Sequence, residues 1–330
     1  MPSKISFMVI SASKKLLSNR ILNRESVLIS VRRNFGVSTK KDMRFVQFKS
    51  KSGGPQHLGA QLSPDGDIFD ISAVDSSIPN SLVKCLQTGN GVIEKTKRII
   101  AAGKSVVSLE DVQLLSPITK PDKIICIARN YTGHCEEQNA PKPTEPVFFN
   151  KFPSCIIGPH DDIVLPTISN RVDWEVELAV VIGVKAKAIR PDQVHKHIFG
   201  YTIAQDISAR DWQKERNGGQ YLLGKAMDTF CPLGPAVVTS DNIVDVNDLN
   251  IKASVNGNEK QNGNTSELIF KTDFIVSYLS QIVTLYPGDV ILTGTPAGVG
   301  VHRSPPQFLK TGDVLESEIE HIGKMSNKVI

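Results

Sequence analysis

The stretch Asp173–Gly183 (DWEVELAVVIG) constrains the fold most strongly, because apolar and acidic residues alternate along it with period 2. One set is apolar (Val172, Trp174, Val176, Leu178 and Val180), and the other is acidic (Asp173, Glu175 and Glu177). Successive side chains of a β-strand point to opposite faces, so the pattern predicts a strand with one apolar and one acidic face. A second strand is predicted over Ile198–Asp206, and it ends in another acid.

The acidic residues of these two strands suggest a metal site. Glu175 and Glu177 are two residues apart, so their carboxylates point the same way, about 6.6 Å apart at the backbone. Like charges at that spacing repel each other unless a cation lies between them. With Asp206 they make an all-carboxylate set, which suits Mg²⁺, Mn²⁺ or Ca²⁺ rather than Zn²⁺. The spacing leaves open the alternative of a solvated acidic face on an edge strand.

Residues 1–41 differ from the rest of the chain in charge. They hold nine Lys or Arg and one acid, Glu25. The other 289 residues carry 29 basic and 33 acidic side chains, which removes the electrostatic basis for binding nucleic acid. The basic, Ser-rich leader predicts a mitochondrial transit peptide over residues 1–35, with a disordered basic tail as the alternative. Arg33-Asn34-Phe35 resembles a matrix-protease site, so we expect a matrix protein that begins near Gly36.

The sequence does not support a membrane protein or a protein held together by disulfide bonds. No apolar run approaches the ~20 residues of a membrane-spanning helix, so no membrane partner is expected. The five cysteines are odd in number and form no CxxC pair. This pattern predicts reduced thiols in an intracellular compartment rather than a disulfide framework.

The chain after the leader is predicted to form two domains. Residues 43–115 form a small α/β accessory domain, and residues 116–330 form the catalytic domain. In the first, strands are expected at Met43–Lys49, Leu58–Leu62 and Ile68–Ile71, and helices at Asn80–Gln87 and Ile93–Ala102. In the second, strands are expected at Lys123–Ile127 and Val290–Leu292, a hairpin turn at Asn256-Gly257, and a helix over Thr272–Leu285, capped by Thr272.

Three further stretches carry polar groups. A helical turn would put His134 and Glu137 on one face, where the carboxylate orients the imidazole as a base. The same spacing also fits an ordinary pair on an exposed helix. Lys225 lies in Gly224–Pro235, which is too rich in turn formers to predict a helix. The Gly-rich loop Thr293–Gly300 lacks a P-loop ending, but its glycines would let backbone N–H groups approach an anionic ligand.

Six runs of the sequence together resemble the fumarylacetoacetate hydrolase superfamily, in its order and spacing. They are ARNYTGHCEEQN, FFNKF, DWEVELAVVIG, AQDISARDWQ, GKAMDTFCPLGP and YPGDVILTGTPAGVG, and they lie within about residues 115–330. The resemblance implies an α+β fold of mixed, strongly curved β-sheets with short helices, usually as a homodimer.

The same resemblance implies roles for individual residues. It makes Glu175, Glu177 and Asp206 the ligands of Mg²⁺ or Mn²⁺, and it makes His134 and Glu137 a catalytic dyad on a lid. It places five further side chains where they contact the substrate or support the metal: Arg210, Gln213, Lys225, Lys151 and Thr295. Lys225 is also a candidate proton donor, with a simple salt bridge to the substrate carboxylate as the alternative.

The implied substrate is a small 2-oxo acid, and the motifs leave three reactions open. These are hydrolysis of an acylpyruvate, decarboxylation of oxaloacetate, and keto–enol tautomerisation of oxaloacetate. Together with the leader, the resemblance favours the tautomerase, which converts the enol, an inhibitor of succinate dehydrogenase, to the keto form. The non-enzyme alternative is a metal-binding partner of another mitochondrial enzyme. A protein that acts only as a scaffold has no physical need for carboxylates that repel one another, which argues against that alternative.

Overall fold

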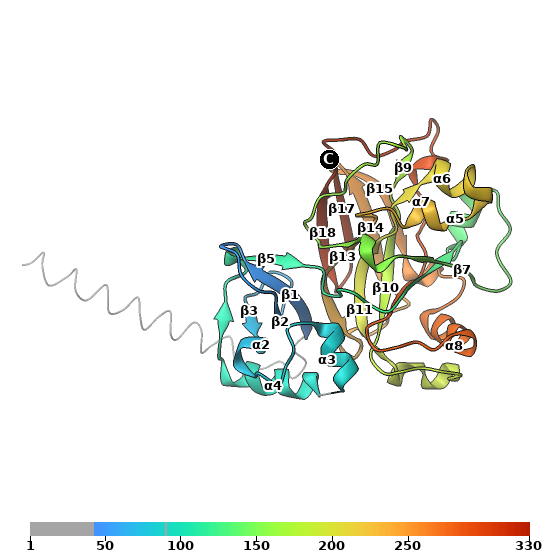
Figure 1. Ribbon diagram of the computed structural model, residues 1–330. Helices are drawn as coiled ribbons and strands as arrows, with labels where there is room; N and C mark the ends of the chain where they lie inside the picture. The colour runs from blue at the N-terminus through green and yellow to red at the C-terminus, as the bar shows by residue number, and fades with distance from the viewer. Residues whose placement is uncertain (1–42, 90) are drawn as a thin grey trace, which may run out of the picture. The chain divides into compact units, whose positions relative to one another are not determined.

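A mixed sheet of twelve strands carries most of the fold in residues 43–89 and 91–330, the part that the computed structural model describes (Figure 1). In order, its main path is β4 (Val106–Val107), β3 (Ile68–Asp70), β2 (His57–Gln61), β1 (Arg44–Ser50), β13 (Cys231–Thr239), β11 (Ile198–Gln205), β10 (Val176–Ile182), β16 (Val290–Leu292), β6 (Ile124–Ala128) and β7 (Val147–Lys151). β5 (Val112–Leu115) pairs with β1, and β8 (Ile156–Ile157) with β13. Only β16–β6 and β13–β8 are parallel among these described pairs.

Two smaller sheets complete the β-structure of the described residues. The four-stranded sheet runs β15 (Asn258–Asn264), β14 (Asn250–Val255), β17 (Val314–Ile319) and β18 (Gly323–Lys328), and the two-stranded one pairs β12 (Ser208–Ala209) with β9 (Val172–Asp173). The β14–β15 turn at Asn256-Gly257 has positive φ at both residues, so the predicted hairpin is confirmed. Apolar residues of the four-stranded sheet share one core cluster with β10 and β11.

Short helices connect and flank the strands. They are α2 (Ile71–Val74), α3 (Leu82–Thr88), α4 (Val92–Ala102), α5 (Thr132–Glu137), α6 (Arg210–Lys214), α7 (Leu222–Lys225) and α8 (Thr272–Ile282). Among the residues described, no helix is long and apolar enough to cross a membrane. The mixed α+β class is therefore confirmed.

The predicted cap and end of the long C-terminal helix are wrong. Thr272 is the first residue of α8, and the preceding Lys271 is the N-cap, with no side-chain hydrogen bond. The helix ends at Ile282, because Val283 is already extended. Apolar spacing alone extended the prediction to Leu285, which instead pairs with Ala186 in an isolated β-bridge.

The strand predicted over Asp173–Gly183 is interrupted. It forms β9 and β10, and Trp174 and Glu175 lie between them. The Glu175 N–H donates to the side-chain oxygen of Gln205 rather than to a backbone oxygen of a neighbouring strand. Across this break the apolar face changes sides, since Trp174 packs in a different core cluster from Val176.

All seven residues of β10 are buried, so the alternative of a solvated acidic face on an edge strand is wrong. Strand β10 lies between β11 and β16, and both of its faces are covered.

The stretch around Lys225 also departs from the prediction. Gly224 and Lys225 belong to the short helix α7, and Cys231–Thr239 forms a strand that contains two prolines. A Cβ at Gly224 would lie 2.5 Å from the backbone nitrogen of Gln213, so glycine allows α7 to pack onto α6. Gly224, which counts as a turn former in the sequence, is therefore required where α7 packs against α6.

Strand β1 pairs with β2 and β5 within the N-terminal segment and with β13 outside it. The N-terminal strands thus extend the main sheet, while the domain boundary near Leu115 stays a prediction. The transit peptide and its cleavage site lie outside the described residues.

Candidate active site

The three acids of the predicted metal site meet where β10 begins and β11 ends. Glu175 directly precedes β10, Glu177 is its second residue, and Asp206 directly follows β11. The antiparallel register pairs Val176 with Gln205, which brings both strand ends to one place. One oxygen from each carboxylate lies within 4.8 Å of the others, and all three residues are buried.

The carboxylate of Glu177 has little to neutralise it. Its Oε2 accepts the Gly294 N–H at 2.6 Å, and it forms no ion pair with the residues described here. Burial and the nearby Asp206 and Glu175 raise the pKa of Glu177 well above its usual value. A divalent cation would relieve this repulsion, so the donor set fits a hard metal ion.

Glu175 lies in the opposite electrostatic environment. Burial opposes its ionisation, but Lys225 and Arg210 together lower its pKa below the usual range. Its two oxygens lie 2.7 Å from Lys225 Nζ and 2.7 Å from Arg210 Nη1. Of the two glutamates, Glu175 is therefore held ionised by cations of the protein itself.

Two lysines anchor Asp206. Lys225 Nζ lies 2.6 Å from Asp206 Oδ2, so this ammonium bridges Asp206 and Glu175. Lys151 Nζ lies 2.7 Å from Asp206 Oδ1 and also donates to the main-chain oxygens of Ile207 and Lys225. Burial opposes the charge on Lys151, but Asp206 raises its pKa. Lys151 lies behind Asp206 and does not line the pocket, so its position favours support of the ligand over contact with substrate.

Arg210 connects the trio to a fourth acid. Its Nε lies 2.8 Å from Asp173 Oδ2, and its Nη1 donates to Gln213 at 3.0 Å. Asp173 also accepts backbone N–H bonds from Gly300 and Val301. Asp173 is therefore fully engaged in holding the chain together.

The Gly-rich loop that follows β16 binds carboxylates of the chain itself. Three of its backbone N–H groups donate to Glu177 (2.6 Å), Glu137 (2.8 Å) and Asp173 (2.7 Å). Gly298 has φ +109°, and a Cβ there would lie 2.1 Å from the Lys260 carbonyl oxygen. The sequence predicted an anionic ligand here, and the carboxylates that the loop meets are internal.

The predicted pair on α5 is formed. His134 Nδ1 lies 2.5 Å from Glu137 Oε1, and the other Glu137 oxygen accepts the Gly298 N–H. His134 is only 7% exposed and lines the pocket, so the alternative of a pair on an exposed helix is wrong. The carboxylate orients the imidazole, as a general base requires.

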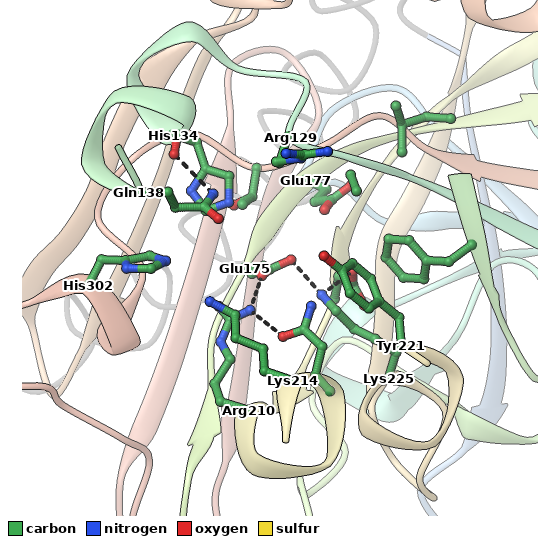
Figure 2. A pocket seen from close by; sticks show the side chains of 16 residues that line it. Arg129, His134, Gln138, Glu175, Glu177, Arg210, Lys214, Tyr221, Lys225 and His302 are labelled. Atoms are coloured by element: carbon green, nitrogen blue, oxygen red, sulfur yellow. Dashed lines mark hydrogen bonds and ion pairs between the residues drawn. The ribbon is translucent and has the colours of Figure 1, made fainter. Parts of the chain in front are cut away.

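The carboxylate trio, His134, Arg210, Gln213 and Lys225 line one pocket that opens to solvent (Figure 2). Thr295 also lines it and is held by hydrogen bonds to Val176 and Gln261. Eight lining residues were not singled out from the sequence as site residues: Ile127, Ala128, Arg129, Gln138, Phe149, Lys214, Tyr221 and His302. Arg129 and Gln138 lie in the run ARNYTGHCEEQN, so the family resemblance offered a signal for them. For His302 the sequence offered none.

The chain is similar to known proteins in sequence. The fumarylacetoacetate (FAA) hydrolase C-terminal family model matches residues 123–330. The human protein named "Oxaloacetate tautomerase FAHD2A, mitochondrial" is 49% identical over 290 residues, which cover 88% of this chain and 92% of the human one.

Two solved structures share the fold. Fumarylacetoacetate hydrolase from Exiguobacterium antarcticum is 33% identical with a TM-score of 0.73, over 87% of this chain and 99% of the other. Maleylpyruvate hydrolase from Sphingobium sp. SYK-6, in complex with manganese(II) ion and pyruvate, is 29% identical with a TM-score of 0.72 over the same shares. A metal is thus supported by both the donor set and a relative.

Proposed function

The chain belongs to the fumarylacetoacetate hydrolase family, and from this premise we propose that it is a metal-dependent oxaloacetate tautomerase. It converts enol-oxaloacetate to the keto form. One observation carries the proposal: a buried carboxylate trio, two of whose members are bridged by Lys225, in a chain 49% identical to a protein named oxaloacetate tautomerase.

The metal ligands in this proposal are Glu175, Glu177 and Asp206, and Mg²⁺ is the first choice, with Mn²⁺ or Ca²⁺ as alternatives. When bound, the cation supplies Lewis-acid stabilisation of the negative charge that develops on the C2 oxygen of the substrate. The three buried carboxylates provide the oxygen donors for the cation, and Glu177, which has no ion pair among the described residues, provides negative charge that the protein does not neutralise.

Tautomerisation moves one proton from the C2 hydroxyl and places one on C3. His134, oriented through Nδ1 by Glu137, takes the hydroxyl proton at its free Nε2. Lys225 delivers a proton to C3 from Nζ, which its two ion pairs hold at the pocket floor. Arg210, Gln213 and Thr295 line the pocket and orient the bound acid, while Lys151 supports Asp206 from behind.

Hydrolysis of an acylpyruvate is the second candidate, and a specific observation favours it. The His134–Glu137 pair is arranged as a base that can activate water, and the related maleylpyruvate hydrolase holds pyruvate. Attack of that water on the C4 carbonyl would break the C3–C4 bond. Decarboxylation of oxaloacetate needs no attacking water and would also release pyruvate.

One assay separates these reactions. The purified protein with Mg²⁺ is given enol-oxaloacetate, keto-oxaloacetate and acetylpyruvate, and both enol absorbance and pyruvate are followed. We expect the enol absorbance to disappear far faster than pyruvate forms. Pyruvate that accumulates as fast as the enol disappears would replace the tautomerase with the lyase or hydrolase. A protein that binds Mg²⁺ and speeds none of these reactions would support the non-enzyme alternative.

The location and assembly of the protein are part of the same proposal. The human relative is named mitochondrial, and residues 1–35 have the composition of a transit peptide. We therefore propose a matrix enzyme that begins near Gly36 and forms a homodimer. N-terminal sequencing of the mitochondrial protein checks the first point, since an intact Met1 would reject it. Light scattering of the purified protein checks the second.

A further inference from the structure

Arg129 is a charged group of the pocket that the mechanism above does not use. Its guanidinium forms no ion pair or side-chain hydrogen bond with any residue of the described chain, and its Nε is buried without a partner. Arg210 lies across the pocket (Figure 2), and its Nε and Nη1 bind Asp173, Glu175 and Gln213, so only its Nη2 is buried without a partner. An arginine that borders a pocket without an internal counter-ion is available for an anionic ligand.

The backbone holds Arg129 in a defined place. It directly follows β6 and has φ +54°, a conformation that non-glycine residues adopt rarely and that costs free energy. The next residue, Asn130, is fully buried, and its side chain donates to the main-chain oxygens of Thr293 and Phe270 and accepts the Phe270 N–H. These bonds fix the chain at Arg129 against the Gly-rich loop.

Other cations near the mouth are less suited to hold an anion. Lys214 is exposed, on a flexible side chain, and forms no hydrogen bond or ion pair within the described residues. Burial and the neighbouring Lys214 lower the pKa of His302, which favours its neutral form. A guanidinium keeps its charge and can hold a carboxylate through two parallel hydrogen bonds.

We propose that Arg129 binds the second carboxylate of a dicarboxylic 2-oxo acid and so selects such acids over monocarboxylic ones. This inference rests on the proposed function, in which the 2-oxo acid end of the substrate lies at the carboxylate trio. The lining residues include four Lys or Arg side chains and three carboxylates. A divalent cation bound at the carboxylates adds to this excess of positive charge, which suits a dianion. Arg129 is thereby a specificity-determining residue that contacts the substrate away from the reacting atoms.

The test compares oxaloacetate with pyruvate, which is the same molecule without the C4 carboxylate. Both are titrated by calorimetry into the Mg²⁺-loaded wild type and into Arg129→Gln, Arg129→Lys and Lys214→Gln. Arg129→Gln is expected to weaken oxaloacetate binding about 10- to 100-fold, as the loss of charged hydrogen bonds does, and to change pyruvate binding less than about twofold. Arg129→Lys falls between these values, because the charge remains without the paired geometry. Lys214→Gln removes the other cation at the mouth and is expected to weaken oxaloacetate binding clearly less than Arg129→Gln does.

Equal weakening of both ligands by Arg129→Gln, or no weakening, would overturn the proposal. So would a selective loss of oxaloacetate binding in Lys214→Gln, because the second carboxylate would then lie at the opposite side of the mouth. If Arg129→Gln does not fold, the ratio in Arg129→Lys decides in the same way. These affinities need no turnover, so a wild type that binds both acids but does not speed loss of the enol would reject the tautomerase and leave this inference standing.

Discussion

Two walls of the pocket differ in how far their charges are neutralised by the protein itself. The α6–α7 wall (Arg210, Gln213 and Lys225) is almost fully buried, and its two cations form ion pairs with Asp173, Glu175 and Asp206. The α5 wall (Arg129, His134, Glu137 and Gln138) makes its side-chain hydrogen bonds within the wall or to Gly298, and Arg129 forms none.

The difference separates groups that the fold needs from groups that are free to meet a ligand. Removing one partner of a buried ion pair leaves an uncompensated charge in a medium that solvates it poorly. A change in the α6–α7 wall should therefore cost both stability and activity. A change in the α5 wall should affect binding and rate with little effect on stability.

The largest effect is expected for Lys225→Met in the α6–α7 wall. Loss of the proton donor should lower the rate of enol conversion by about 10²–10⁴. The free energy of unfolding of the metal-free protein should fall by about 3–5 kcal/mol, because Glu175 and Asp206 lose their shared counter-ion. Mg²⁺ binding by calorimetry should persist. Lys310→Met is the control, because Lys310 is exposed and does not line the pocket, and near-wild-type activity in Lys225→Met would remove Lys225 from the mechanism.

Arg210→Met tests whether the ion pairs of the α6–α7 wall stabilise the fold. It removes the cation between Asp173 and Glu175, so we expect a loss of about 3–5 kcal/mol in the free energy of unfolding, measured with urea. Arg190→Met provides the control, because Arg190 pairs with Asp192 on the surface and should give no measurable change. An equal stability of both variants would show that the α6–α7 wall is not needed by the fold.

His134→Asn tests the α5 wall. We expect the rate of enol conversion to fall about 10²-fold while the melting temperature stays within about 1–2 °C of the wild type, because His134 pairs only within α5. Glu137→Gln keeps the shape of the pair and should show a smaller loss of rate. A large drop in melting temperature would mean that the dyad supports the fold as much as the opposite wall does.

The smallest change in stability is expected for Glu177→Gln, which lies between the walls. The wild type should melt at a higher temperature in Mg²⁺, since a ligand that binds only the folded state stabilises it, and the variant should lose this rise. Without metal, the variant should melt about 1–2 °C higher than the wild type or at the same temperature, because one of three repelling carboxylates is gone. A metal-free variant clearly less stable than the metal-free wild type would contradict the repulsion inferred from the structure.

Local patterns in the sequence predicted much of the fold and part of the site. Period-2 alternation predicted that Glu175 and Glu177 lie together, which they do although Glu175 directly precedes β10, and the spacing of His134 and Glu137 placed them on one helical turn. These relations depend on backbone geometry within a few residues, so the chain alone contains them. The same logic failed at Trp174 and at Gly224, where a strand break and a helix contact are decided by distant residues.

The sequence by itself determined which residues carry charge, which lie next to each other along an element, and that an all-oxygen donor set would suit a hard cation. Only the tertiary structure decided which of those charges are neutralised. The antiparallel register of β10 with β11 brings Asp206 to Glu175 and Glu177, and α7 brings Lys225 to two of them but not to the third. Electrostatic energies depend on separations of a few ångströms and on burial, and both arise when segments far apart in the chain pack together. For that reason Glu175 and Glu177, equivalent in the sequence pattern, have pKa values shifted in opposite directions, and Arg210 forms two ion pairs within the protein whereas Arg129 forms none with the described residues.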